Sequence, residues 1–418
     1  MPRPPIGQQV HAALVTQGHQ AAIDLAVGAG QPDLFERVRA VAHEEPAPSF
    51  LHSALCAMSL PVRRPVDDQQ PIIRQDGQYT LVITPKATVQ MVDGQQALQV
   101  LGVPYGSLPR LVLIHIMTEA VRSKSRHVML GHSFTDWMRR MGFKTISYGP
   151  RGSATLIRQQ LDRLLACEWM IRWDKEDAQG NTEFAVREIK LANEYTGTDG
   201  KGGAFRREIF LTEGFFEHLR KHAVPLNEHA IRQLRDSATA LDLYTWLAYR
   251  LPRITPGRPA TLNWQQLAVH FGNEGTHIRK FRQTVRDAWE RHVSAVYPEA
   301  RADFDTTIIR LHASPAPLQR KLVPGAHLAM VPPSPPAVFV EPDAGTRFFA
   351  ALSVALGPVD FRAWFRDAKL EAVEPGWQLV VPTAFKADWI RGRYPVALEA
   401  GRVAAGLDQV PEIVVRRA

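Results

Sequence analysis

Basic and amide side chains line one face of a helix that we expect over residues 276–297. Apolar residues recur there at helical spacing, among them Ile278, Phe281 and Val285, and predict the buried face. Arginines dominate the opposite face, and a guanidinium group can pair bidentately with guanine. This pattern is typical of a helix that contacts DNA. The candidate contacts are Thr276, His277, Arg279, Lys280, Arg282, Gln283 and Arg286.

A second helix of this kind is expected over residues 153–166, with four leucines (156, 161, 164 and 165) on one face. Its candidate DNA contacts are Arg151, Ser153, Thr155, Arg158, Gln159 and Arg163. Residues 151–166 contain three basic residues (151, 158, 163) and one acidic residue (162), a net charge of +2. Residues 275–296 contain five basic residues (279, 280, 282, 286, 291) and two acidic residues (287, 290), a net charge of +3. We therefore expect the later helix to contribute more to affinity.

Each of these helices is the third in a similar order of elements. The first series has helices over 108–123 and from Ser133, the helix 153–166, and strands over 168–173 and 182–190 around a turn at 177–181. The second has helices over 237–251 and 261–271, a turn at 273–275, the helix 276–297, and a strand over 306–312. Helix, helix, basic helix, strand is the order of a winged helix, whose third helix enters the major groove. The alternative is a small α+β core with a solvated basic helix.

The rest of the chain frames these two series. We expect helices over 8–27, 33–43 and 50–60, a hairpin over 72–84, and a polar loop over 194–204 followed by a strand over 205–211 and a helix capped by Thr212. The run Gly200-Lys201-Gly202-Gly203 lacks the spacing of a phosphate loop. A small domain is expected after a proline-rich linker. Its elements are helices over 348–356 and 361–368, strands over 370–373 and 377–381, a helix capped by Thr383, and a strand over 412–415.

The predicted fold class is α+β: tandem winged helices with a helical and hairpin N-terminal region and a small C-terminal α/β, KH-like domain. The expected domains are an N-terminal arm (1–48), a first winged helix (49–224), a second (225–314), a linker (315–345) and a C-terminal domain (346–418).

Composition limits the function. The 418 residues carry 50 Lys and Arg against 42 Asp and Glu, a net charge of +8, which favours a polyanionic partner. Cys56 and Cys167 match no metal or redox spacing and are expected to be buried free thiols. The start of the chain has no apolar leader, and no run is long enough to span a membrane, so we expect a cytoplasmic protein.

Catalytic patterns are missing from the sequence. Its 15 histidines include no His-x-His pair and no HExxH, and His115 and His270 fall on apolar helix faces. Tyr105, Tyr148 and Tyr195 have no evident base or metal beside them. We therefore expect a protein without catalytic residues, cofactor or bound metal.

Residues 49–314 resemble the plasmid-encoded RepA replication initiators. The resemblance is carried by Gly102, Pro104-Tyr105-Gly106, Pro109-Arg110, Thr118-Glu119-Ala120, Leu130-Gly131, Gln159-Gln160-Leu161 and residues 241–247. The sequence departs from the family at 147–152, where a glycine pair is expected. The resemblance implies binding to repeated origin sites in double-stranded DNA, repression of the protein's own gene, and homodimers in exchange with active monomers.

The C-terminal domain resembles the N-terminal domain of the chromosomal initiator DnaA, through Phe361-Arg362-Ala363-Trp364, the strand pair and residues 382–394. The resemblance implies that Asp360, just before a helix, and Phe385 bind the host replicative helicase or its loader. Trp364, Trp389 and Tyr394 lie at helical spacing and are expected in the core. The function expected from the whole sequence is a plasmid replication initiator. The alternatives are a winged-helix repressor and an origin-nicking enzyme.

Overall fold

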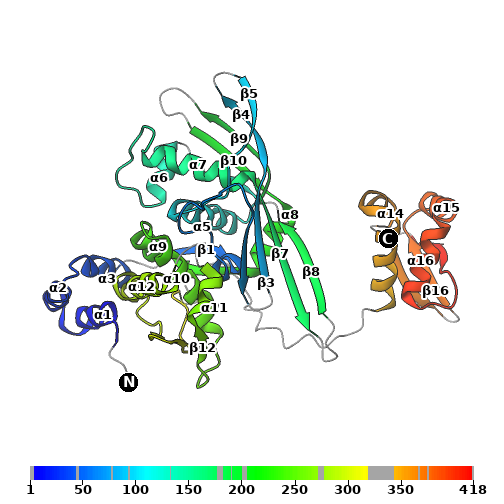
Figure 1. The fold of residues 1–418 in the computed structure, drawn as a ribbon. Helices are drawn as coiled ribbons and strands as arrows, with labels where there is room; N and C mark the ends of the chain where they lie inside the picture. The colour runs from blue at the N-terminus through cyan, green and yellow to red at the C-terminus, as the bar shows by residue number, and fades with distance from the viewer. Residues whose placement is uncertain are drawn as a thin grey trace. The chain divides into compact units, whose positions relative to one another are not determined.

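The computed structural model describes residues 4–416, except 44–46, 77–78, 93–94, 132, 177–181, 190, 200–204, 272–276, 319–342, 366–367 and 374–375. The chain divides into two compact units near residue 330, and each is described by itself. Both units mix helices and strands (Figure 1), so the expected α+β class is confirmed at this level.

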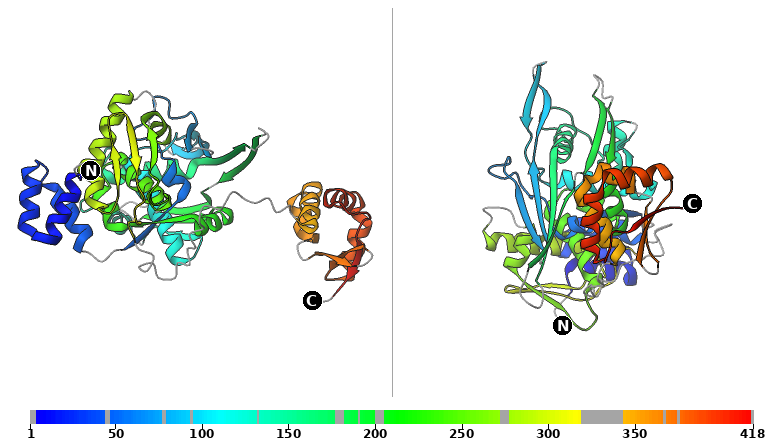
Figure 2. Two further views of the ribbon diagram at one scale, coloured as in Figure 1. Left: turned by 90° about the horizontal axis from the view of Figure 1, so that it is seen from below. Right: turned by 90° about the vertical axis from the view of Figure 1, so that its right-hand side faces the viewer.

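Three short helices open unit 1 and pack together at one end of it (Figure 2). The single helix expected over 8–27 is wrong, because Gly18 adopts a φ of +90° and divides it. Glycine tolerates this conformation, which costs other residues energy. The helices are α1 (Ile6–Gln17), α2 (His19–Gly28) and α3 (Asp33–His43).

The helix expected over 50–60 is also wrong. Strand β1 (Pro48–His52) pairs antiparallel with β11 (Ala223–Asn227), and Phe50 lies opposite Pro225. Only α4 (Ser53–Ala57) is helical, and the imidazole Nδ1 of His52 caps it by accepting from the Ala54 N–H. A strand partner far away in sequence therefore overrides the local helical pattern.

The first three-helix series is confirmed. It consists of α5 (Ser107–Ser123), α6 (Phe134–Arg140) and α7 (Ser153–Ala166). The Ser133 hydroxyl accepts from the Asp136 N–H at the start of α6, and Gly142 follows its end with a φ of +90°. The apolar face of α7 is shifted from the expected one, since Leu156 is exposed and Ile157 is buried.

The strands after α7 join sheets that local patterns do not reveal. Strands β7 (Cys167–Glu176) and β8 (Thr182–Ile189) continue the predicted hairpin of β2 (Ile72–Asp76) and β3 (Tyr79–Pro85), in the order β2-β3-β7-β8. A separate hairpin consists of β4 (Ala87–Val92) and β5 (Gln95–Val100).

The loop expected over 194–204 is wrong for its first part. Strand β9 (Ala192–Asp199) pairs with β10 (Phe205–Leu211), with Tyr195 opposite Ile209, and β10 also pairs with β6 (His127–Met129). Pairing along β10 gives the polar residues of β9 partners for their backbone groups. Residues 200–204 lie outside the described residues.

The second three-helix series is present with one correction. The helix expected over 261–271 begins at Trp264, because residues 260–263 form a strand that pairs with β14. The sheet order is β12-β14-β13. Two helices precede this series, α8 (Glu213–His222, capped by Thr212) and α9 (Glu228–Leu234). The series has α10 (Ala238–Arg250, capped by Ser237), a 3-10 turn (Leu251–Arg253), β12 (Ala260–Asn263), α11 (Trp264–Phe271) and α12 (Ile278–Ala288). After α12 come a π-helical turn (Trp289–Val293), α13 (Ser294–Val296), β13 (Ala302–Phe304) and β14 (Ile308–Leu311).

One buried ion pair joins the two series. The Arg110 guanidinium on α5 donates to both carboxylate oxygens of Asp242 on α10, each at 2.6 Å. Its remaining N–H groups donate to the carbonyl oxygens of Leu60, Pro61 and Gly106. The Arg110 side chain is 6% exposed and the Asp242 side chain is 5% exposed. Every donor of this arginine thus has an acceptor inside the core.

Unit 2 has a three-stranded sheet, β15 (Lys369–Val373), β16 (Gly376–Val381) and β17 (Glu412–Val415), with β17 parallel to β16. The two helices expected over 348–356 and 361–368 are wrong, because α14 (Ala344–Phe365) is continuous. The Thr383 hydroxyl caps α15 (Ala384–Arg393) as predicted. Helix α16 (Pro395–Ala405) packs on α14 through Gly401, where a Cβ would lie 2.8 Å from the Phe348 ring.

Among the described residues, no helix combines the length and the apolar character that a membrane crossing needs.

We predict that replacing Arg110 by Leu lowers the free energy of unfolding by about 3–5 kcal/mol, because Asp242 is left buried without its partner. Urea unfolding followed by circular dichroism measures the change. Arg39→Ala, which breaks the exposed ion pair with Glu36, is the matched control and should cost at most about 0.5 kcal/mol. Equal effects of the two substitutions would contradict the role of the Arg110–Asp242 pair as a buried ion pair that stabilises unit 1.

His115 gives unit 1 a pH dependence. Its pKa falls from 6.5 to about 4, first because burial penalises the imidazolium and then because Arg140 repels it. The folded state therefore binds the proton less well than the unfolded chain, so this contribution to stability is complete above pH 6.5 and lost as pH falls toward 4.

Between pH 6.5 and pH 4 we predict that the free energy of unfolding falls by about 3 kcal/mol through His115, and that His115→Gln abolishes this loss. Urea midpoints measured across the pH range give the difference, and His19→Gln, at an exposed position, is the control. A pH profile unchanged by His115→Gln would refute the prediction.

Candidate nucleic-acid interface

Helix α12 presents a basic face to solvent. Phe281, Val285 and Ala288 are buried, and they orient the helix with its polar side outward. The exposed positions are His277, Arg279, Lys280, Gln283 and Arg286, as the sequence predicts. Thr276 and the predicted turn 273–275 lie outside the described residues.

Arg282 differs from its neighbours on α12 because it contacts the adjoining hairpin. Its Nη1 donates to the Thr306 carbonyl at 2.8 Å, between β13 and β14. Beside it, the Thr306 N–H donates to Asp305, and this bond lowers the pKa of that carboxyl. Arg282 therefore ties α12 to the hairpin, while Gln283 Nε2 donates to Asp287 at 2.9 Å.

The candidate contacts near α7 divide into an exposed pair and an engaged set. Arg151 and Gln159 are exposed. The hydroxyl of Ser153 accepts from the Ser147 N–H at 3.1 Å, and that of Thr155 donates to the Gly149 carbonyl at 2.6 Å. These two hydroxyls therefore shape the loop before α7.

Two arginines predicted to touch DNA make contacts within unit 1. Arg158 lies over the Phe134 ring, 4.5 Å from its centroid. Arg163 is 14% exposed and donates to Asp68 at 2.7 Å and to the Val103 carbonyl at 2.9 Å. Arg158 is half-buried and Arg163 is largely buried, so we do not count them among the exposed candidate contacts.

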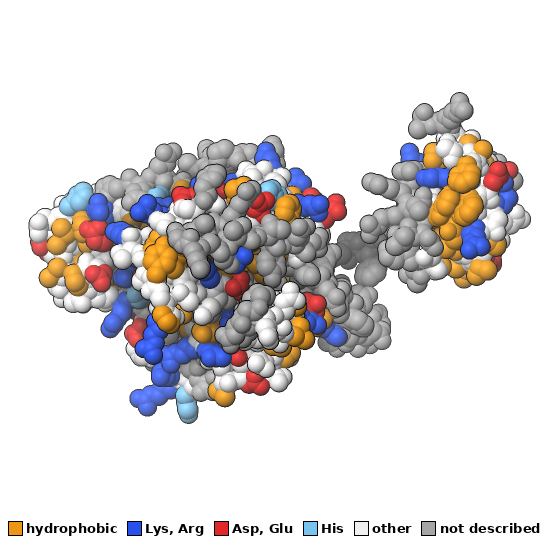
Figure 3. Space-filling view, turned by 90° about the horizontal axis from the view of Figure 1, so that it is seen from above, with side chains coloured by type: hydrophobic (Ala, Val, Ile, Leu, Met, Phe, Trp, Pro, Cys, Tyr) orange, Lys and Arg blue, Asp and Glu red, His pale blue; other side chains and the backbone are white. Residues whose placement is uncertain are grey.

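Basic side chains gather on part of the surface of unit 1. In the face shown in Figure 3, Lys and Arg side chains form a group toward the lower left. Such grouping raises the local potential and favours a polyanion.

The N-terminal helices support the far end of the α12 helix. The π-helical turn after α12 leads into α13, and Gly7 of α1 approaches α13 so closely that a Cβ would lie 2.5 Å from Ser294 Oγ. Arg37 of α3 donates to the Arg291 carbonyl at 3.1 Å. Sequence analysis assigned no role to this region, because the contacts join residues more than 250 positions apart.

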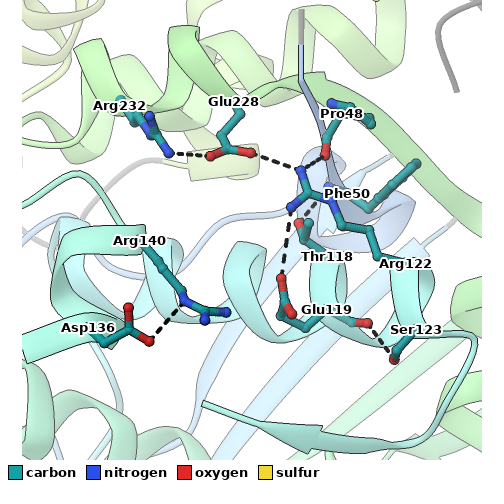
Figure 4. Close-up of polar contacts among 10 residues, drawn as sticks. All are labelled: Pro48, Phe50, Thr118, Glu119, Arg122, Ser123, Asp136, Arg140, Glu228 and Arg232. Carbon is teal, nitrogen blue, oxygen red and sulfur yellow. Dashed lines mark hydrogen bonds and ion pairs between the residues drawn. The ribbon is translucent and has the colours of Figure 1, made fainter. Parts of the chain in front are cut away.

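A polar crevice of about 230 Å³ lies between α5, α6 and α9 (Figure 4). Glu228 accepts from Arg122 at 2.8 Å and from Arg232 at 2.5 Å, and Arg140 pairs with Asp136 at 3.1 Å (Figure 4). Thr118 Oγ1 accepts from the Phe50 N–H at 2.8 Å. The crevice was not predicted, because its residues come from four segments, in β1, α5, α9 and the end of α6. Its paired charges join α5 to α9.

The described residues contain no group of three or more His, Cys, Asp or Glu side chains arranged to hold a metal ion. His52 Nε2 lies 2.6 Å from His218 Nδ1, so one of these nitrogens donates to the other. Both cysteines are buried free thiols, as predicted, and burial raises the pKa of Cys167 to about 12. A thiol with so high a pKa is a poor nucleophile at neutral pH.

Unit 2 carries an aromatic cluster on its surface. The rings of Trp364 and Trp389 stack with centroids 5.1 Å apart, and Phe385 lies 6.0 Å from each. Phe385 is 67% exposed and Trp389 43% exposed, so the expectation that Trp389 is a core residue is wrong. Tyr394 packs against the core. Asp360 lies within α14, not before a helix, and its side chain lies outside the described residues.

No curated protein matches the chain. A crystal structure of domain 2 and domain 3 of RctB is 12% identical, with a TM-score of 0.39, over 63% of this chain and 99% of that chain. The family model described as plasmid encoded RepA protein matches residues 103–266, from just before α5 to the start of α11. The resemblance to the plasmid-encoded RepA initiators that the sequence indicates is thereby confirmed over these residues.

Proposed function

We propose that this protein is a plasmid replication initiator that binds repeated sites in origin DNA through two winged helices and recruits host replication machinery through unit 2. The observation that carries the proposal is the exposed basic face of α12, in a chain whose residues 103–266 match the RepA family. Origin binding is what this similarity to the RepA family implies.

The element order supports the winged-helix assignment. In the second series, β12 lies between α10 and α11 and pairs with β14 of the hairpin after α12. In the first series, β6 lies between α5 and α6 and pairs with β10. We therefore assign β13–β14 as the second wing and β9–β10 as the first, in place of β7–β8, which pairs with β3.

The two proposed recognition helices make unequal contributions. Without Arg158 and Arg163, the exposed predicted contacts near α7 are Arg151 and Gln159. Helix α12 keeps Arg279, Lys280 and Arg286 exposed. The later helix therefore supplies most of the affinity and the base readout, as the net charges already suggested.

Unit 2 is assigned a recruiting role. Exposed large aromatic side chains are typical anchors of protein interfaces. The cluster of Trp364, Phe385 and Trp389 includes Phe385, at the position where the DnaA resemblance implies helicase binding. The proposed partner is the host replicative helicase or its loader, and self-association of unit 2 is the competing assignment.

Arg286→Ala tests readout by α12. Loss of one bidentate pair with guanine should weaken binding to the origin site by about 1–3 kcal/mol, and binding to random DNA much less. Gel-shift titrations use duplex DNA flanking the protein's gene and a scrambled duplex. Arg220→Ala on α8, also exposed, is the matched control. An equal loss on both duplexes would leave Arg286 only a phosphate contact.

Phe385→Ala tests recruitment. Truncating an exposed anchor should abolish helicase loading at the origin and leave DNA binding intact, because Phe385 lies outside unit 1. Loading is measured by strand displacement on a plasmid carrying the origin. Val396→Ala, at an 83% exposed position on α16, is the control. If a chain lacking residues 346–418 loads helicase as well as the full chain, the assignment fails.

A further inference from the structure

The loop Ser147–Gly152 joins α6 to α7 (Figure 1) and carries a large exposed aromatic residue, Tyr148. Tyr148 is 62% exposed, and its hydroxyl lies 3.4 Å from Thr135 Oγ1. The ring buries little of its apolar surface in the fold. A tyrosine combines large apolar area with few rotatable bonds, which suits it to binding a flat partner.

Local hydrogen bonds give this loop a defined shape. The Ser147 N–H donates to Ser153 Oγ at 3.1 Å, and the Ser153 N–H donates to Ser147 Oγ at 2.9 Å. Gly149 adopts a φ of +104°, and a Cβ at Gly152 would overlap the Ser147 carbonyl. Because the loop that carries the Tyr148 ring is already ordered, little backbone conformational entropy is lost when the ring binds a partner.

The charge around the loop selects an anionic partner. Between Asp136 and Asp162 the chain has five basic residues and no acidic residue. Arg151 lies in the loop itself and is exposed, as is Lys144 shortly before it. An exposed ring beside exposed cations is the combination that binds unpaired nucleic acid, where bases stack on aromatic side chains and basic groups follow the backbone. The basic residues are Arg139, Arg140, Lys144, Arg151 and Arg158. Arg140 pairs with Asp136 and Arg158 lies over Phe134, so the exposed group near the loop consists of Arg139, Lys144 and Arg151.

We propose that Tyr148 stacks on an unpaired nucleobase of opened DNA while Arg151 contacts an adjacent phosphate. The proposal rests on the proposed DNA-binding function and deepens it. In a closed duplex the faces of the bases are covered by their neighbours, so the ring can stack only where the duplex is opened. Tyr148 thus favours opened over closed origin DNA.

Fluorescence polarization of the full chain tests the proposal with two fluorescein-labelled probes. One is the closed duplex flanking the protein's gene, and the other is the same duplex with a central unpaired bubble. Tyr148→Ala should weaken binding to the bubble about 5- to 150-fold, the range for loss of one stacked base. Affinity for the closed duplex should change by no more than about twofold. Tyr148→Phe keeps the ring and should bind both probes like the natural protein.

A second readout reports stacking directly. With 2-aminopurine in the bubble, the natural protein and Tyr148→Phe should quench its fluorescence, and Tyr148→Ala should not. Equal loss on both probes would overturn the proposal in favour of a groove contact. Loss on neither probe would also overturn it and leave an acidic protein segment as the partner of the loop.

The same probes test the proposed origin binding independently of the Tyr148 contact. If the natural protein does not distinguish the flanking duplex from a scrambled one, site-specific origin binding is wrong. A Tyr148-dependent preference for the bubble would still establish the stacking contact in that case. A chain that binds none of these DNAs would refute both.

Discussion

The ion pair between Arg110 and Asp242 is the constraint on which the arrangement of unit 1 depends. Burial raises the pKa of Asp242, and the Arg110 charge opposes this effect. An ion pair taken out of water repays its desolvation only when its geometry is good and its remaining donors are satisfied. Here the guanidinium meets two carboxylate oxygens and three carbonyls. Because the pair joins α5 to α10, it sets the first helix of one series against the first helix of the other.

This junction joins the two helix series that contain α7 and α12 into one core. A second, more exposed link runs from Arg122 through Glu228 to Arg232, and pairs of this exposure contribute little free energy. The N-terminal helices add a third constraint, since they pack against the π-helical turn and α13 that continue α12. Because α7 and α12 are held in one unit in this way, their proposed joint binding to DNA would cost less conformational entropy.

Arginine shows how one residue type takes opposite roles in this chain. Arg279 and Arg286 are exposed on α12, whereas Arg110, Arg158 and Arg163 pack against carboxylates, carbonyls or rings within unit 1. The helical spacing of the sequence predicts that Arg158 and Arg163 lie on the polar face of α7. It could not reveal that Asp68 and Phe134 cover that face, because these partners lie 95 and 24 positions away.

Features that depend on neighbouring residues could be predicted from the sequence. The bounds of α7, the caps at Ser133, Thr212 and Thr383, and the exposed face of α12 follow from helical spacing and from side chains bonding to nearby N–H groups. Four features became evident only in the folded chain: the pairing of β1 with β11, the strand β9, the junction at Arg110 and the crevice beside Glu228. Each of these requires a partner remote in sequence, and a backbone or charged group adopts the conformation in which such a partner satisfies it.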